Sequence, residues 1–400
     1  MAIKILEIGT GYTSIPAKVG AATEIVVEEL TRSLLKAGAD AKILDIQDNQ
    51  RAATSLPIKD VCFPQFLNTT FHNLGIFHKF KRVLYSLSLV PALKRNHGTE
   101  KTVLHFHNQY NFFFYDLLSR FLPGRGKAQT AYTVHSYVWG FPWEQIKDTI
   151  HKKYFMEIRA IKKADLVLCL NEGARSLFME HFGVQASKLK VVLNGVNTDT
   201  YRPLYTPEAK RLKRQVRGIN ANRLALHVGS VCPRKNQLGI LEDLLPAIQD
   251  NGLDFAFAGG IIDHEYLEQI HSFAQEHNIK EQVHYLGEVT PGAELNEIYN
   301  LADLFVFNST SEAFSLAPLE AMSSGAPVFF GDINVSDTLI SLEAGIKRFR
   351  TGHFYEQHQQ LVQDEAALAA LGAKGRELIV QTYSWDKVAE DYNTAFKAIL

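Results

Sequence analysis

The segment from Ala302 to Asp332 reads ADLFVFNSTSEAFSLAPLEAMSSGAPVFFGD and contains the pattern of a strand, a loop, a helix and a second strand. Phe305, Val306 and Phe307 form a short apolar run typical of a buried strand, and APVFFGD repeats that pattern. Between the two, LAPLEAMSSG predicts a helix that ends at Gly325. A strand, a crossover helix and a further strand indicate a parallel sheet.

The same alternation runs through the whole chain. Before Pro203 the strand patterns are IKILEIG, AKILDI, TVLHFH, AQTAYTV, ADLVLCL and KLKVVLNGV, with helical periodicity between them. After Pro203 a second series follows: RLALHVGS, LDFAFAGG, VHYLGEV, ADLFVFNS and APVFFGD. Because 400 residues exceed what one hydrophobic core usually holds, we expect an α/β protein with two doubly wound, Rossmann-like domains that face each other across a cleft.

The domain boundary is expected in NGVNTDTYRPLYTPEAKRLKR, where turn-forming residues give way to a basic polar run. This divides the chain into residues 1–203, residues 204–382 and a closing segment, residues 383–400. The closing segment contains SWDKVAEDYNTAFKAIL, which predicts an amphipathic helix that packs back on the first domain.

Composition excludes several classes of protein. With 43 acidic and 42 basic residues the formal charge is −1, so we expect no nucleic-acid binding through phosphates. Cys62, Cys169 and Cys232 are widely spaced, which indicates neither a disulfide framework nor a zinc site and fits a reducing cytoplasm. The start MAIKILEIGT is a poor signal peptide, and no apolar run approaches the roughly 20 residues that span a bilayer.

Glu312 and Glu320 are the two glutamates of the opening segment. Glu312 is expected in the loop at the carboxyl end of its strand, and Glu320 within about the first turn of the next helix. There a carboxylate stabilises a helix by about 0.3–1 kcal/mol, which is one interpretation of Glu320. The apolar residues around Glu320 favour another, a buried acid that requires hydroxyl or cationic partners.

A family resemblance appears in the pattern E-x-F-S-L-x-x-L-E-A-M-x-x-G-x-P-V from Glu312 to Val328, preceded by Ser309. It resembles the E-x7-E signature of retaining nucleotide-sugar glycosyltransferases with the GT-B fold, the large family four group. Similar to that family are also TVHS, AIKKADLVLCLNEGARSLF, VVLNGVNTDTYRP, VGSVCPRKN, FAGG, LGEV and YSWDKVAEDY. This ordered set covers nearly the whole chain.

The resemblance implies roles in donor binding for the residues of this signature. Glu320 would accept hydrogen bonds from the two ribose hydroxyls of a nucleotide, and Glu312 would face hydroxyls of the donor sugar. The N–H groups of Phe314, Ser315 and Leu316 would lie near sugar and phosphate at the start of the helix.

Positive charge is expected at Lys235, where the resemblance implies an ammonium that neutralises charge on the departing diphosphate. The alternative is a solvated loop lysine. The family usually carries an Arg directly after the strand glycine, whereas this chain has Ser230 there, and the neighbouring Arg234 is the candidate replacement. Near the N-terminus Gly20 is expected to make a turn beside the donor phosphates, because Ala21 and Ala22 stand where the family often has a Gly pair.

His135 resembles the family histidine beside the reacting sugar, where it would donate a hydrogen bond to a sugar hydroxyl or to the transition state. The alternative is a structural histidine at a strand end. His105 and His107 in HFHN are secondary candidates. We expect them to alternate about the strand, so that only one of them faces the ligand.

Residues 71–96, FHNLGIFHKFKRVLYSLSLVPALKRN, mix aromatic and basic side chains. Such a helix is suited to an anionic membrane surface or a lipid-linked acceptor. The alternative is a helix half buried on the sheet with a solvated basic edge.

The function implied by the resemblance is a hexosyltransferase with His135, Lys235 and Glu312 in catalysis. It would use a nucleotide-sugar donor, a UDP-sugar in the first place and a GDP-sugar in the second. The acceptor would be a glycan, a lipid-linked molecule or a protein, and the anomeric configuration would be retained. No cofactor and no metal are expected. The alternative is a catalytically weak binding subunit that recognises glycan or nucleotide and works with a partner.

Overall fold

The computed structural model describes residues 3–17, 22–67, 75–96, 101–121, 128–312, 314–332 and 345–400. The chain divides into two compact units. The first consists of Met1–Gly195 together with Trp385–Leu400, and the second of Val196–Ser384. The divisions expected from the sequence were after residues 203 and 382.

The first unit is built on a parallel seven-stranded sheet in the order β3-β2-β1-β4-β5-β6-β7. Its strands are β1 (Lys4–Ile8), β2 (Asp40–Ile46), β3 (Ile58–Val61), β4 (Thr102–Phe106), β5 (Gln129–Thr133), β6 (Leu166–Cys169) and β7 (Leu189–Val191). Its helices are α1 (Ala22–Lys36), α2 (Gly75–Asn96), α3 (Gln109–Leu118), α4 (Trp143–Lys153), α5 (Phe155–Lys163), α6 (Glu172–Phe182) and α14 (Trp385–Lys397).

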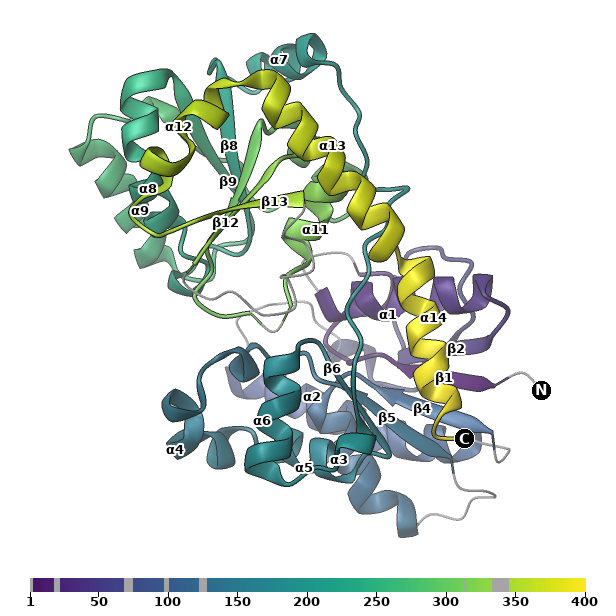
Figure 1. The fold of residues 1–400 in the computed structure, drawn as a ribbon. Helices are drawn as coiled ribbons and strands as arrows, with labels where there is room; N and C mark the ends of the chain where they lie inside the picture. The colour runs from purple at the N-terminus through teal and green to yellow at the C-terminus, as the bar shows by residue number, and fades with distance from the viewer. Residues whose placement is uncertain are drawn as a thin grey trace. The chain divides into compact units, whose positions relative to one another are not determined.

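Helices cover both faces of this sheet. Figure 1 shows α1 and α14 side by side on one face and α2, α3 and α5 on the other. The central strands β1, β4, β5 and β6 are almost entirely buried and mostly apolar, as is typical of parallel strands between two helical layers. The larger core lies under α2, α3, α5 and α6, with Leu104 and Tyr132 among its members, and a smaller cluster under α1 includes Val27 and Ile43.

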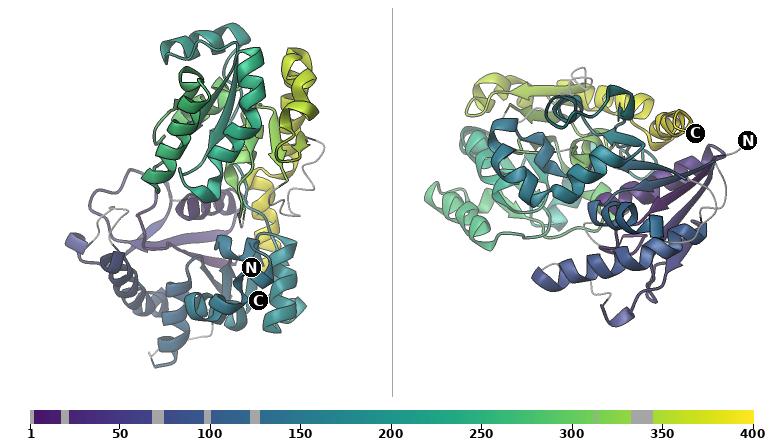
Figure 2. Two further views of the ribbon diagram at one scale, coloured as in Figure 1. Left: turned by 90° about the vertical axis from the view of Figure 1, so that its left-hand side faces the viewer. Right: turned by 90° about the horizontal axis from the view of Figure 1, so that it is seen from below.

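The second unit is built on a parallel six-stranded sheet in the order β10-β9-β8-β11-β12-β13. Its strands are β8 (Arg223–Val228), β9 (Leu253–Ala258), β10 (Val283–Tyr285), β11 (Leu304–Phe307), β12 (Val328–Gly331) and β13 (Ile346–Phe349). Its helices are α7 (Pro207–Val216), α8 (Gln237–Asn251), α9 (His264–Glu276), α10 (Ala293–Leu301), α11 (Leu316–Ser323), α12 (Phe354–Gln363) and α13 (Glu365–Thr382). In the left view of Figure 2 the yellow α13 lies on the opposite side of this sheet from the green helices.

These two sheets confirm the prediction of two doubly wound α/β domains. In the first sheet β1 pairs with both β2 and β4, and in the second β8 pairs with both β9 and β11. The chain leaves these strands toward opposite faces, which keeps the carboxyl ends of the strands uncovered at that point. In sheets of this type, ligands bind there.

The closing segment forms α14, which belongs to the first unit and packs against α1. Its buried side chains are Trp385, Val388, Ala389, Tyr392, Ala395 and Phe396. Within the described residues, no helix combines the length and apolar character needed to cross a membrane. The three cysteines are free thiols.

Two strand-to-helix loops of the second unit approach each other closely at Gly259. This residue has φ +145°, and a Cβ added to it would lie 2.2 Å from the carbonyl oxygen of Gly229. Only glycine fits both the backbone conformation and the space. The loop that follows β8 therefore depends on the glycine that follows β9.

We expect Gly259→Ala to lower the free energy of unfolding by about 1–3 kcal/mol through overpacking, in addition to backbone strain of about 1–2 kcal/mol. Gly287→Ala is the matched control, because Gly287 has φ +80° but open space around its Cβ position, so that only the strain applies. Urea unfolding of both variants measures the difference. Equal losses would contradict the close approach.

Candidate active site

A cluster of charged side chains lies at the carboxyl ends of β8 and β11. Lys235 and Arg234 follow β8, Glu312 follows the neighbouring β11, and the two strands pair in parallel. Lys235 Nζ donates a hydrogen bond to Glu312 Oε1 at 2.6 Å, and Arg234 Nη1 donates to the same oxygen at 3.0 Å. The structure thus brings two predicted site residues, Lys235 and Arg234, to the carboxylate of a third, Glu312.

These side chains are not solvated loop residues. The side chains of Lys235, Arg234 and Glu312 are 12%, 27% and 17% exposed. Arg234 Nη1 also donates to the carbonyl oxygen of Ser311 at 3.0 Å, which fixes the guanidinium against the loop after β11. The second positive charge, which Ser230 does not supply, is therefore present at Arg234. Ser230 itself is half-buried, and its carbonyl oxygen accepts a hydrogen bond from Gln237 Nε2 at 3.0 Å.

Glu320 is buried, and its partners are hydroxyl groups, in agreement with the expectation for a buried acid. Tyr299 Oη on α10 donates to Glu320 Oε2 at 2.8 Å. Burial raises the pKa of Glu320 to about 7, although hydrogen bonds from Tyr299 and Tyr201 act in the opposite direction. The expected place in the first helical turn is wrong, because α11 begins at Leu316 and has no acidic residue in its first turn.

The N-terminus of α11 lies between the two acids. Ser315 is its N-cap and is buried, but its side chain makes no capping hydrogen bond. Phe314 and Leu316 on either side are half-buried. The first N–H groups of a helix have no partner within the helix, so this end of α11 is suited to an anion or a hydroxyl.

A second cluster lies in the first unit at the reversal point between β1 and β4. Glu7 on β1 is paired in register with His105 on β4. His105 Nδ1 lies 2.8 Å from Glu7 Oε2, and His107 Nε2 lies 2.8 Å from the same oxygen. His107 Nδ1 in turn lies 3.0 Å from His135 Nε2. His135 is thereby connected to a buried carboxylate through one imidazole.

The expectation that only one of His105 and His107 faces the site is wrong. Residues two apart in a strand point to the same face, and the two imidazole centroids are 4.0 Å apart. Both rings contact Glu7. His105 Nε2 is 2.7 Å from Thr133 Oγ1, and its ring packs against Phe396 of α14.

The ionisation of this cluster follows from its pairing. Burial acts to raise the pKa of Glu7, but His105, followed by His107, outweighs it and lowers that pKa to about 2. Burial, assisted by His105, lowers the pKa of His107 to about 4. Burial also lowers the pKa of His135 well below its usual value. The cluster is therefore an ionised carboxylate hydrogen-bonded to His105 and to the neutral imidazole of His107.

Glu7, His105 and His107 also form the set of potential metal ligands found among the described residues, with ligand atoms within 4.8 Å of one another. Each of these atoms already lies at hydrogen-bond distance from another member of the set. The geometry is that of protonated imidazole nitrogens around a carboxylate, so we assign it to hydrogen bonding.

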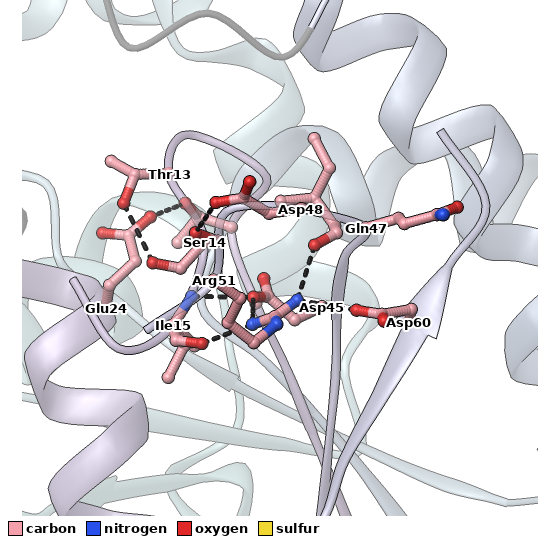
Figure 3. A network of polar contacts seen from close by, with 12 residues as sticks. Thr13, Ser14, Ile15, Glu24, Asp45, Gln47, Asp48, Arg51 and Asp60 are labelled. Carbon is pink, nitrogen blue, oxygen red and sulfur yellow. Dashed lines mark hydrogen bonds and ion pairs between the residues drawn. The ribbon is translucent and has the colours of Figure 1, made fainter. Parts of the chain in front are cut away.

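The loop after β1 is held in place by acidic side chains, of which Asp45 is buried (Figure 3). The N–H of Ile15 donates to Asp45 Oδ2 at 2.8 Å, and Arg51 Nη1 donates to the same oxygen at 2.7 Å. Arg51 Nη2 donates to Asp60 Oδ1 at 2.7 Å. Ser14 Oγ donates to Asp48 Oδ2 at 2.5 Å. This network holds residues 9–17 in place at the end of β1, in the same sheet that carries Glu7 and His105.

Glu24 on α1 closes the same network from the other side. It is buried, and Thr10 Oγ1 donates a hydrogen bond to its carboxyl group. Burial raises the pKa of Glu24 to about 7. Gly20, which was expected to make a turn near this helix start, lies outside the described residues, and its role stays a prediction.

A cavity of about 1060 Å³ lies elsewhere in the second unit, near the amino ends of β8, β11 and β12. None of the predicted site residues lines it. Several of its charged side chains bind one another or the backbone, as in the 2.6 Å pair between Arg214 and Asp303. The cluster of Lys235, Arg234 and Glu312 lies at the opposite edge of the sheet.

Two residues of these clusters were missed by the sequence analysis. Glu7 is a single acid within the otherwise apolar strand IKILEIG, and Tyr299 lies on α10, outside the signature around Glu320. A buried charge inside a parallel strand requires a partner on a neighbouring strand. Together with two histidines in HFHN, this signal points to the Glu7 cluster.

Comparison with known proteins follows the same division of the chain. A model described as "Glycosyltransferase Family 4" matches residues 23–200, and one described as "Glycosyl transferases group 1" matches residues 209–377. An Escherichia coli relative, "UDP-Gal:alpha-D-GlcNAc-diphosphoundecaprenol alpha-1,3-galactosyltransferase", is 25% identical over 282 residues, 70% of this chain and 68% of the relative.

Two solved structures share the fold. Sucrose-phosphate synthase from Thermosynechococcus elongatus has a TM-score of 0.75 and 19% identity, covering 98% of each chain. Anabaena HepE in complex with UDP and glucose has a TM-score of 0.71 and 16% identity, covering 99% of each chain. The fold is that of the GT-B glycosyltransferases, as predicted. The chain belongs to the glycosyltransferases that the two family models describe.

The raised pKa of Glu24 predicts how stability depends on pH. Since the folded protein holds this proton up to about pH 7, whereas the unfolded chain releases it near 4.5, stability falls as pH rises between these values. The contribution is about 1.4 kcal/mol per pH unit. In Glu24→Gln this part of the pH dependence is absent, while Glu144→Gln, an exposed-site control, keeps it.

Urea unfolding of the three proteins at about pH 5 and about pH 7.5 measures the effect as a difference between variants, which removes the other titrating groups. An identical pH dependence in wild type and Glu24→Gln would contradict it.

Proposed function

We propose that the protein transfers a hexose from a nucleotide-sugar to a glycan or lipid-linked acceptor and retains the anomeric configuration. The observation that carries this proposal is the convergence of Lys235 and Arg234 on Glu312 at the carboxyl ends of β8 and β11. Two cations beside a helix N-terminus suit a diphosphate leaving group. A UDP-sugar is the first choice of donor and a GDP-sugar the second, and the UDP-Gal in the name of the E. coli relative supports that order.

Glu312 keeps the two cations together before the donor binds. Without this carboxylate, Lys235 and Arg234 would repel each other in a half-buried place. When the diphosphate arrives, it takes over the cations, and Glu312 is released toward hydroxyls of the sugar. Lys235 then stabilises the charge that grows on the leaving phosphate oxygen.

Retention follows without an enzymatic nucleophile. Glu312, once released from Lys235 and Arg234, faces hydroxyls of the sugar and forms no bond to the anomeric carbon. In a front-face substitution the bond from the anomeric carbon to the phosphate oxygen breaks, and the acceptor oxygen bonds to the same face of that carbon. The leaving phosphate oxygen takes the acceptor proton. The protein contributes orientation and electrostatic stabilisation.

Glu320 is proposed to bind the ribose of the nucleotide. An ionised carboxylate accepts hydrogen bonds from two vicinal hydroxyls, and its present partners are also hydroxyls. The ribose would replace or join Tyr299 at the same oxygen atoms. Nucleotide binding then requires Glu320 to be ionised.

The first experiment is calorimetric titration with UDP, GDP, ADP, CDP and dTDP. We expect one nucleotide to bind and Glu320→Ala to weaken it by about 1–3 kcal/mol. Because the pKa of Glu320 is about 7 in the free protein, affinity should fall by up to about tenfold per pH unit as pH drops below 7. Glu320→Gln should remove this dependence. Unchanged affinity in Glu320→Ala would contradict the ribose role.

Lys235→Ala should reduce turnover more than it reduces donor affinity, because the ammonium is needed most when the leaving group is charged. Steady-state rates compared with calorimetric affinities separate the two effects. Lys280→Ala, at an exposed position of the same unit, serves as the control. Equal losses of turnover and affinity would mean that Lys235 only binds the donor.

The alternative, a binding subunit that works with a partner, is not favoured by the charged cluster. A binding surface has no need for two cations poised on one acid where a diphosphate would depart. The alternative was suggested by Ser230 in place of the family Arg and by Ala21 and Ala22 in place of the Gly pair. The position of Arg234 beside Glu312 supports it as the replacement for that Arg.

Contact with a membrane is proposed through the first part of α2. Phe77 and Phe80 are 70% and 52% exposed, whereas Tyr85, Leu89 and Leu93 farther along the helix are buried in the core. The helix is thus half buried on the sheet and also presents aromatic residues at one end. This end suits an interface with lipid, and the diphosphoundecaprenol in the name of the E. coli relative supports a lipid-linked acceptor. Residues 71–74 lie outside the described residues.

A further inference from the structure

The hydrogen-bonded chain that ends at His135 limits where its protons reside. Glu7 and His105 are fully buried and His107 is 4% exposed, whereas His135 is half-buried. The chain therefore communicates with a ligand only through His135. A neutral imidazole has one N–H donor and one nitrogen that accepts. The tautomer of each ring then follows from its partner.

The argument starts at the carboxylate. Glu7 accepts from two imidazole nitrogens, His105 Nδ1 and His107 Nε2, both at 2.8 Å from Oε2. An ionised carboxylate only accepts, so His107 carries its proton on Nε2. His107 Nδ1 is left with a lone pair. At 3.0 Å from that lone pair, His135 Nε2 must be the donor.

The last nitrogen is then determined. With its proton on Nε2, a neutral His135 has a lone pair on Nδ1. The described residues place no hydrogen-bond partner on this atom. His105 closes the other branch without conflict, because its Nε2 lies 2.7 Å from Thr133 Oγ1, a hydroxyl that can donate or accept. This arrangement satisfies the hydrogen bonds from Glu7 through His107 to His135.

We propose that Glu7 and His107 are positioning residues that hold His135 in the Nε2–H tautomer and make its Nδ1 a hydrogen-bond acceptor toward the ligand. This rests on the proposed function and on the role that the family resemblance implies for His135, beside the reacting sugar. It reverses the direction expected from the sequence, where His135 was a donor. The group opposite His135 is then a sugar hydroxyl, which donates, and not a phosphate oxygen or another acceptor.

The arrangement also gives His135 a defined response to a closer hydroxyl. A hydrogen bond into Nδ1 polarises the ring and strengthens its Nε2–H bond to His107, which passes the effect to Glu7. The carboxylate stabilises the positive charge that develops on the imidazoles. In this respect the pair resembles the acid that orients the histidine of a catalytic triad.

The test is a two-bond ¹H–¹⁵N correlation spectrum of the protein labelled with ¹⁵N in its histidine rings, which distinguishes protonated from unprotonated ring nitrogens. His135→Gln and His107→Gln assign the signals. We expect His135 with Nε2 protonated and Nδ1 unprotonated. In His107→Phe, which removes the acceptor, we expect His135 to become a mixture of tautomers. A wild-type His135 protonated on Nδ1 would overturn the proposal.

Thr133→Val is the matched control, because it removes the partner of His105 and leaves the path from Glu7 through His107 intact. It should not change the tautomer of His135. Where His107→Phe does not fold, Glu7→Leu replaces it: no oxygen is left to accept from His107 Nε2, so a mixture of tautomers is again expected. A single, unchanged tautomer of His135 in these variants would overturn the proposal that Glu7 and His107 determine it. A stoichiometric metal ion in elemental analysis of the purified protein would also overturn it.

Turnover separates this inference from the proposed function. With the donor and acceptor in hand, His107→Phe should lower kcat by about tenfold or more with little change in donor affinity. If the spectra show the expected tautomers and no nucleotide binds, the tautomer assignment of His135 is confirmed and the proposed function is wrong. Expected tautomers with nucleotide binding but an unchanged kcat would overturn the positioning role.

Discussion

The two reversals of strand order are the constraint on which the rest of this protein depends. At β1 and β4 in the first sheet, and at β8 and β11 in the second, neighbouring strands send their helices to opposite faces. The carboxyl ends of these strands remain uncovered, and the loops that follow them carry polar residues. The histidine chain lies at the first reversal, and the cluster of Lys235, Arg234 and Glu312 lies at the second. Both polar clusters therefore lie where the strand order leaves the carboxyl ends of the strands uncovered.

The acids at these places differ in the partners that they are given. Glu7 shares its charge between two imidazoles, and Glu312 binds two cations. Glu320 and Glu24 are buried with hydroxyl partners, and burial raises the pKa of each to about 7. The two histidines hold Glu7 ionised, whereas Glu320 and Glu24 stay close to their protonation points. The protein therefore contains permanent charges and adjustable ones within the same architecture.

The fold was predictable from the sequence because buried parallel strands and their crossover helices leave a strong apolar pattern. The strand at Leu304–Phe307 and the helix that begins at Leu316 follow that pattern closely. Lys235 and Glu312 were predicted as site residues, but their pairing with Arg234 depends on the register of β8 against β11, which periodicity in one chain does not define. The same applies to Glu7, whose partners lie on another strand about 100 positions away. The expectation for His105 and His107 was wrong because residues two positions apart in a strand point to the same face. The strand itself was predicted correctly.

The C-terminal helix gives the first unit a particular order of assembly. Tyr392 and Phe396 pack over the ring of His105, and α14 joins this unit after the chain has passed through the entire second unit. During synthesis on the ribosome, the sheet surface that carries Glu7 and His105 therefore emerges long before its cover does. Until α14 has been synthesised, the ring of His105 lacks the aromatic cover of Tyr392 and Phe396. The first unit therefore depends for its completion on a helix that follows the whole second unit in the sequence.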